Sequence, residues 1–179
     1  WAGRLRVYRV LAAVLAFLCI AARTHAQTAV GSVTLTPGWA TFGQALPQGV
    51  AFGALKIGSL TTQTDVKTTW PDGSIRFALV TANVTSAGTY SIVTATAAGT
   101  PFTPSLPTAS VALTIGGSTY TATLPGTAST DKWLSGRLVY EGRSVIAPTA
   151  PGKGAHPFLR VIFDTRVYSD RGGRVDVTV

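Results

Sequence analysis

Short runs of β-branched and aromatic residues, separated by glycine, proline and small polar residues, recur along residues 27–179. No stretch of this part shows apolar residues at the 3.6-residue spacing of a helix between capping residues. The pattern is typical of an all-β protein and predicts an antiparallel domain that is barrel-like or sandwich-like. Strands are expected near residues 30–35, 50–57, 62–70, 74–84, 88–97, 109–115, 118–123, 136–146, 158–168 and 174–179.

The segment QTDVKTTWPDGSIRFALV, residues 63–80, has the pattern of two strands joined by a tight turn. Pro71 sets φ at about −65° in the second turn position, and Gly73 accepts a left-handed backbone. WPDGS therefore predicts a type I turn that ends in a glycine bulge. The strand after the turn is apolar on both faces except at Arg76, which is typical of a central strand covered on both sides.

Arg76 is the unusual residue of this hairpin, because a guanidinium among apolar neighbours needs a carboxylate or carbonyl partner. Asp65 and Asp72 are close enough in sequence to supply one. One interpretation is a substrate-binding site, in which Arg76 and Asp72 contact a sugar or carboxylate and the Trp70 indole stacks on a pyranose ring. The other is a buried Arg–Asp pair under the tryptophan, which staples the hairpin. Turn chemistry favours the second interpretation.

Two further hairpins are expected in the second half of the chain. Gly116-Gly117, between SVALTI and STYTATL, suits a two-residue turn that needs positive φ. In the last hairpin, apolar and polar residues alternate in both strands, and pairing of Tyr168 with Arg174 would place Arg166 opposite Asp176. We interpret this charged pair as structural, worth about 0.2–1 kcal/mol, and not as a catalytic dyad.

Residues 1–26 differ from the rest and match a secretory signal peptide. Arginines precede an apolar run of 13 residues, Val10 to Ala22, and small residues occupy the −3 and −1 positions of a cleavage site after Ala26. The run is shorter than the roughly 20 residues that span a bilayer. The sequence therefore predicts export to the periplasm or the extracellular space, an all-β domain over residues 27–179, and no stable membrane anchor after cleavage.

Removal of the signal peptide would lower the net charge. Four of the 15 basic residues and none of the 7 acidic residues lie in residues 1–26, so residues 27–179 hold 11 basic and 7 acidic residues, a net charge of +4. The basic residues are scattered and form no stripe with aromatic residues that would mark a nucleic-acid-binding face. This mild positive charge is compatible with an acidic polysaccharide as partner, although an ordinary solvated surface explains it better.

Residues 27–179 carry few groups for catalysis or metal binding. They contain no cysteine and a single histidine, His156, so they supply neither a thiolate site nor a multi-histidine zinc site. No Gly-x-Ser-x-Gly elbow accompanies His156, which we interpret as a loop residue without a catalytic role. Asn83-Val84-Thr85 matches a glycosylation sequon but lies in an expected strand. We predict no catalytic residue, no metal and no cofactor in this part.

Two more tryptophans of residues 27–179 lie outside the 63–80 hairpin. Trp133, together with Tyr140, is expected to pack in the core. Trp39, in LTPGWATFGQALPQGV, is interpreted in a similar way, as an apolar residue between glycine and proline turns.

Three segments together resemble a known module: residues 63–80, WLSGRLVYEG and HPFLRVIFDTRVYSDRGGRVDVTV. They look like the N-terminal β-barrel module, RIFT-like in fold, of exo-rhamnogalacturonan-lyase-like proteins. Similar β modules occur in exported and phage-borne proteins without known activity. The resemblance covers most of residues 31–179, and its matching motif positions are Trp70, Pro71, Asp72, Gly73, Ser74 and Arg76.

In that family the module precedes a helical toroid that carries the active site. The resemblance therefore implies a carbohydrate-associated protein whose catalytic part, if any, lies beyond Val179. The strand-like pattern at the end of the sequence also predicts a fragment of a longer chain. We expect an exported accessory β module of a polysaccharide-acting protein, non-catalytic by itself. The alternative is a structural or adhesive β module of a cell surface or phage particle, which the threonine- and alanine-rich strands fit equally well.

Overall fold

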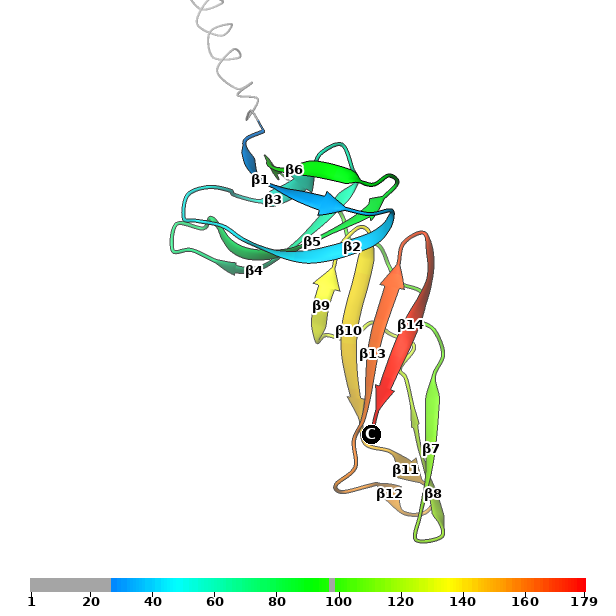
Figure 1. Ribbon diagram of the computed structural model, residues 1–179. Coiled ribbons are helices and arrows are strands. Elements are labelled where there is room, and N and C mark those ends of the chain that lie inside the picture. Colours follow the sequence, from blue (N-terminus) through cyan, green and yellow to red (C-terminus); the bar gives the residue numbers. More distant parts are fainter. Residues whose placement is uncertain (1–26, 97–98) are drawn as a thin grey trace, which may run out of the picture.

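The chain folds into two stacked lobes built from β-strands (Figure 1). The computed structural model describes residues 27–96 and 99–179, and within these ranges it contains no helix. Strands β1 to β6 form the N-terminal lobe and strands β7 to β14 form the C-terminal lobe, and every strand pair is antiparallel. The all-β prediction is confirmed. The predicted signal peptide lies outside the described residues.

The N-terminal lobe packs two three-stranded sheets around one apolar core. The sheet orders are β1-β6-β3 and β2-β5-β4. Leu55, Ile57 and Ile92 from the first sheet meet Ile75 and Val80 from the second, all of them buried. The strands span β1 (Ala29–Leu35), β2 (Gly38–Ala45), β3 (Ala54–Ile57), β4 (Thr62–Thr69), β5 (Ile75–Val84) and β6 (Gly88–Ala95).

The C-terminal lobe repeats this plan with two four-stranded sheets, β14-β13-β10-β9 and β12-β11-β8-β7. Val161 and Phe163 of one sheet pack against Ala122 of the other and against Leu124, which follows it. In both lobes the sheets face each other as in a sandwich and do not close into a barrel. The strands span β7 (Ser110–Ile115), β8 (Ser118–Thr123), β9 (Lys132–Ser135), β10 (Val139–Ile146), β11 (Thr149–Ala150), β12 (Gly154–Ala155), β13 (Val161–Tyr168) and β14 (Arg171–Thr178).

Strand β5 is covered on both faces, as its sequence predicts. Ala78 and Val80 belong to the core of the N-terminal lobe. Leu79 packs on the opposite face, against Leu134 and Val139 of the C-terminal lobe. The run of apolar residues in β5 therefore serves two cores at once, one inside its own lobe and one at the junction between the lobes.

Four of the described strands, β2, β9 and the two-residue β11 and β12, are absent from the sequence prediction. The region of Trp39 was predicted as turns around an apolar residue, yet β2 pairs with β5 along its whole length, from Gly38↔Val84 to Ala45↔Phe77. Strand β9 pairs with β10. Strands β2 and β9 are edge strands of their sheets, and pairing with an apolar neighbour, β5 or β10, outweighs their low strand propensity.

The two-residue turn at Gly116-Gly117 is confirmed, since both glycines have positive φ, 56° and 74°. The predicted register of the last hairpin is wrong. The connection is shorter than expected, so Tyr168 pairs with Arg171, and a register shift follows at Val167. Arg166 therefore lies opposite Arg174 and not opposite Asp176.

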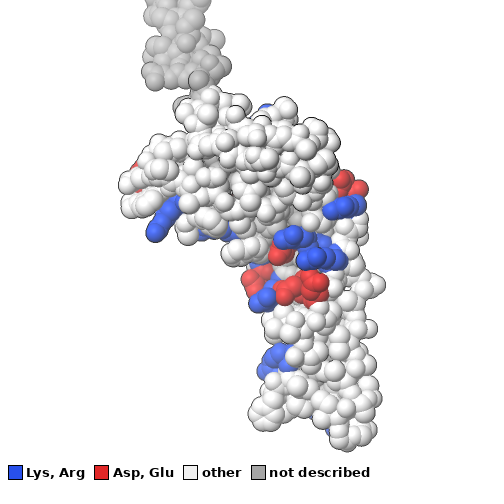
Figure 2. All heavy atoms as spheres, in the orientation of Figure 1, with Lys and Arg blue, Asp and Glu red and all other residues white. Residues whose placement is uncertain are grey.

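The charges of this sheet pair in other ways. Arg166 binds Glu141 on β10, its neighbour on the other side. Arg174 contacts Asp176 within its own strand at 3.2 Å. Figure 2 shows Lys, Arg, Asp and Glu side chains gathered below the N-terminal lobe, while most of the remaining visible surface carries no charge.

Candidate functional site

The turn after β4 forms as its sequence predicts. The Gly73 N–H donates to the Trp70 carbonyl at 2.9 Å, and the Trp70 N–H donates to the Ser74 carbonyl at 2.8 Å. Gly73 has a φ of 82°, a left-handed conformation that residues with a side chain rarely adopt. The predicted turn with its closing glycine is therefore confirmed.

Asp72, one of the three predicted site residues, is engaged in building this turn. Its Oδ1 accepts the Ser74 N–H at 3.0 Å and the Ser74 hydroxyl at 2.6 Å. The hydrogen bonds from Ser74 lower the pKa of the Asp72 carboxyl below its ordinary value. The Ser74 Oγ in turn accepts the Gly49 N–H at 2.9 Å, which ties the turn to the loop between β2 and β3.

Trp70 is fixed by the same loop. Its Nε1–H donates to the Leu46 carbonyl at 3.0 Å, and the Leu46 N–H donates to the Arg76 carbonyl at 3.0 Å. The indole is half-buried, and its orientation is set by this side-chain hydrogen bond. The Arg76 guanidinium carbon lies over the ring, 4.9 Å from its centroid. Trp70 and Arg76 thus form a cation–π pair on a fixed support.

The predicted buried pair between Arg76 and an aspartate is wrong, because Arg76 is exposed. Asp65 accepts the Ser135 N–H at 2.7 Å instead, and Asp72 is bound to Ser74. Among the residues that the structure describes, Arg76 forms no ion pair.

A β-bulge explains this exposure. The register between β4 and β5 shifts on both sides of Thr68. Ile75 and Ala78 both face the core of the N-terminal lobe, so the two residues between them are turned away from it. Phe77 packs at the lobe junction and Arg76 reaches solvent. Strict alternation along β5 does not anticipate this arrangement.

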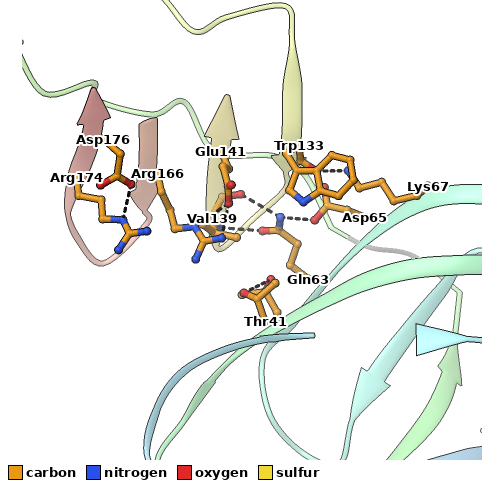
Figure 3. A network of polar contacts seen from close by, with 11 residues as sticks. Thr41, Gln63, Asp65, Lys67, Trp133, Val139, Glu141, Arg166, Arg174 and Asp176 are labelled. Atoms are coloured by element: carbon orange, nitrogen blue, oxygen red, sulfur yellow. Dashed lines mark hydrogen bonds and ion pairs between the residues drawn. The ribbon is translucent and has the colours of Figure 1, made fainter. Parts of the chain in front are cut away.

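The lobe junction is held by Gln63, a residue that sequence reasoning did not single out (Figure 3). Its side chain is fully buried, with an exposed fraction of 0%. Oε1 accepts the N–H groups of Leu138 and Val139, each at 2.8 Å, and Nε2 donates to the Val139 carbonyl at 3.0 Å and to Asp65 at 2.6 Å. All four hydrogen-bonding positions of the amide are therefore filled, three of them by the other lobe.

A second cation–aromatic pair lies beside Gln63 (Figure 3). Lys67, on β4, donates to the Trp133 carbonyl, and its Nζ lies 4.8 Å from the centroid of the Trp133 ring. The predicted core position of Trp133 is wrong, since 55% of its surface is exposed, whereas Tyr140 is buried as expected. Two cation–aromatic pairs therefore lie near β4: Lys67 of the strand pairs with Trp133 at the junction, and Trp70, which follows the strand, pairs with Arg76 at the turn.

Trp39 also has an arginine over its ring. It packs against Tyr168 across the junction, with 4.6 Å between the ring centroids, and Arg171 lies over both rings. Nearby, the Asn83 side chain of the sequon is exposed and donates to Asp170 at 3.3 Å. These contacts join the two lobes on the side of β2 and β13.

Arg76 is an exposed guanidinium without an acidic partner among the described residues. A guanidinium that is exposed and has no acidic partner is suited to bind a carboxylate or phosphate. Within residues 27–96 and 99–179, no three His, Cys, Asp or Glu side chains gather as a metal site would require. In the same ranges, no helix has the length and apolarity needed to span a membrane.

Comparisons with family models, with curated proteins and with solved structures find no match to this chain.

Proposed function

We propose that this chain is an exported, non-catalytic β module that binds an acidic polysaccharide as the accessory part of a polysaccharide-acting protein. The observation that carries the proposal is the Trp70–Arg76 pair. Its guanidinium is exposed, has no acidic partner among the described residues, and rests on an indole whose orientation is fixed. A uronic acid residue has a carboxylate that suits the Arg76 guanidinium and an apolar ring face that suits the Trp70 indole.

The three site residues have separate roles in this proposal. Arg76 contacts the carboxylate of the sugar, and Trp70 holds the guanidinium and offers the rim of its ring. Asp72 contributes by shaping the turn, since its Oδ1 accepts two hydrogen bonds from Ser74. The resemblance of the hairpin to the module of exo-rhamnogalacturonan-lyase-like proteins points to pectic glycans as the first class of ligand to test.

Affinity gel electrophoresis of the purified protein on polygalacturonate, rhamnogalacturonan and a neutral glucan tests the proposal. We expect retention on the two acidic polymers only. Arg76→Leu should weaken it about tenfold, since a hydrogen bond to a charged group contributes about 1.5–3 kcal/mol. Arg76→Lys should restore only part of the affinity, because lysine keeps the charge but loses the planar fork.

Arg174→Leu is the matched control, because Arg174 is an exposed arginine on β14 in the other lobe and its removal changes the net charge equally. Equal loss of retention in Arg174→Leu and Arg76→Leu would show that only net charge matters. Absence of retention of the unmodified protein on both acidic polymers would reject the function.

A structural or adhesive module of a cell surface or phage particle is the second candidate function. The lobe junction favours it, because a fully satisfied buried amide and a second apolar cluster fasten the lobes to each other. A rigid two-lobe spacer requires such a junction, and it needs no ligand at Arg76. In that case Arg76→Leu would leave every measured binding property unchanged.

A further inference from the structure

Three rings gather in the C-terminal lobe at the end away from the N-terminal lobe. The His156 ring lies edge-on to Tyr120 of β8, with 5.0 Å between the centroids, and 6.4 Å from the Phe158 ring. They belong to β8 and to the segment after β12, and in Figure 1 both lie at the lower end of the molecule. We call Tyr120, His156 and Phe158, with Lys153 and Arg160, the distal patch.

Phe158 is the most exposed large apolar residue that the structure describes, with 89% of its surface in contact with solvent. The loop that carries it is nevertheless fixed. His156 Nδ1 accepts the N–H groups of Phe158 and Leu159, at 3.3 and 3.1 Å. Arg160 donates to the carbonyls of His156, Pro157 and Leu159, at 3.3, 3.4 and 2.7 Å. The ring is held in solvent by a preorganised loop, which favours recognition over a chance exposure.

The hydrogen bonds of His156 also define what it offers to a ligand. Because Nδ1 accepts two N–H groups, the neutral ring carries its proton on Nε2. The Nε2–H is then a donor on a ring that lies next to the Tyr120 and Phe158 rings. Apolar ring surface with a few placed polar groups is the composition of a small-molecule or sugar site.

The charge of the distal patch is positive. Residues 99–130 and 144–163 contain no aspartate or glutamate, whereas Lys153 and Arg160 lie within the patch and are exposed. On the face shown in Figure 2, the lower end of the molecule displays Lys and Arg but no Asp or Glu. The partner of this surface is therefore expected to be anionic.

We propose that the distal patch is a second binding site, for an anionic glycan. A sugar ring stacks on Phe158, the His156 Nε2–H donates to a hydroxyl or ring oxygen, and Lys153 contacts the anionic substituent. The distal patch suits a lipid surface less well, because one exposed aromatic ring and two cations are too few to attach a protein stably to a membrane. Since the lobe junction fixes the two lobes, the site at Arg76 and the distal patch are held apart at a set spacing, and a polymer that reaches both gains avidity.

The test compares Phe158→Ala with Phe52→Ala, which removes another exposed phenylalanine, in the N-terminal lobe. Retention of the full chain is measured on polygalacturonate gels, and pelleting is measured with vesicles of phosphatidylserine and phosphatidylcholine. We expect Phe158→Ala to weaken retention at least fivefold, Phe158→Tyr to keep it, and Phe52→Ala to match the unmodified protein. Circular dichroism confirms that each variant is folded.

The experiment distinguishes rejection of the site at Arg76 from rejection of the distal patch. Loss of retention in Phe158→Ala but not in Arg76→Leu supports the distal patch and rejects the first site. Equal retention of Phe158→Ala and Phe52→Ala overturns the distal patch, whatever Arg76→Leu does. Unchanged retention of Phe158→Ala together with lost vesicle pelleting also overturns it, in favour of a lipid surface.

Discussion

Replacing Gln63 by leucine tests whether the lobe junction depends on one buried amide. Leucine has a similar bulk but no hydrogen-bonding group, so the N–H groups of Leu138 and Val139 lose their acceptor in a buried position. The Val139 carbonyl keeps a partner, because it also accepts the Gly136 N–H at 3.3 Å. Two orphaned donors at about 1–3 kcal/mol each give an expected loss of about 2–6 kcal/mol in the free energy of unfolding.

This loss is large compared with the usual stability of about 5–15 kcal/mol. For a protein of this size, each kcal/mol corresponds to about 2–4 °C in Tm, so a central value of about 4 kcal/mol lowers Tm by about 8–16 °C. Urea unfolding followed by tryptophan fluorescence and by far-UV circular dichroism measures the change. If the amide couples the lobes, the two probes should give one transition in the unmodified protein and separate transitions in Gln63→Leu.

Gln44→Leu is the matched control, because Gln44 lies in the same lobe and its side chain donates only to the adjacent Ala45 carbonyl at 2.9 Å. Gln44→Leu should lower the free energy of unfolding by less than about 0.5 kcal/mol. If the free energies of unfolding of Gln63→Leu and Gln44→Leu differ by less than about 0.5 kcal/mol, the reasoning is refuted. The loss of an acceptor by two buried N–H groups would then not have the expected cost.

Three further predictions concern single residues of the same region. Gly136→Ala should destabilise by about 1–3 kcal/mol, because the new Cβ would overlap the Gln63 side chain, and a double-mutant cycle with Gln63→Ala should show non-additive losses. Gly73→Ala should cost about 1–2 kcal/mol in urea unfolding because of its φ of 82°, and Gly73→Asn should cost less. Asp72 has a lowered pKa in the folded state, mainly through Ser74, so its contribution to stability is present above the unfolded pKa of about 3.9 and disappears as the pH falls through the folded pKa. Asp72→Asn should therefore show a flatter decline than the unmodified protein when stability is measured from pH 5 to pH 2.

Local chemistry made the 63–80 hairpin predictable. Pro71 and Gly73 each fix a backbone angle that only a turn of this type accommodates, and the apolar run of β5 requires cover on both faces. These constraints act within a few residues, so the sequence contains them in full. The two-residue turn at Gly116-Gly117 is confirmed for the same reason.

The register of paired strands was less predictable, because bulges leave no trace in a count of apolar and polar positions. The shift around Thr68 turns Arg76 to solvent, whereas the apolar residues on both faces of the strand favoured a buried pair. The shorter connection after Tyr168 moves every partner in the last hairpin, so Arg166 takes Glu141 on β10 as its partner. A shift of one residue in the first case and of two in the second changes the neighbours of the charged side chains.

The lobe junction could not be found from the sequence, because Gln63 is 75 and 76 residues away from its partners Leu138 and Val139. One signal was present. The second face of β5 needs an apolar cover, and the adjacent strand β4 offers polar side chains at Gln63 and Asp65. Polar residues next to a strand that must be covered on both faces indicate a polar contact between layers.

The hairpin of β4 and β5 therefore has two functions that depend on each other. At one end of β4, Gln63 fastens the strand to the C-terminal lobe, and beyond the other end the turn orients Trp70 under Arg76. The strand between these points is paired to β5 along most of its length, so its direction is set at the junction. The position of the Arg76 guanidinium relative to the C-terminal lobe thus depends on the lobe junction, to which Gln63 contributes a buried amide. A ligand that contacts both lobes would be sensitive to the loss of Gln63 even though it never touches that residue.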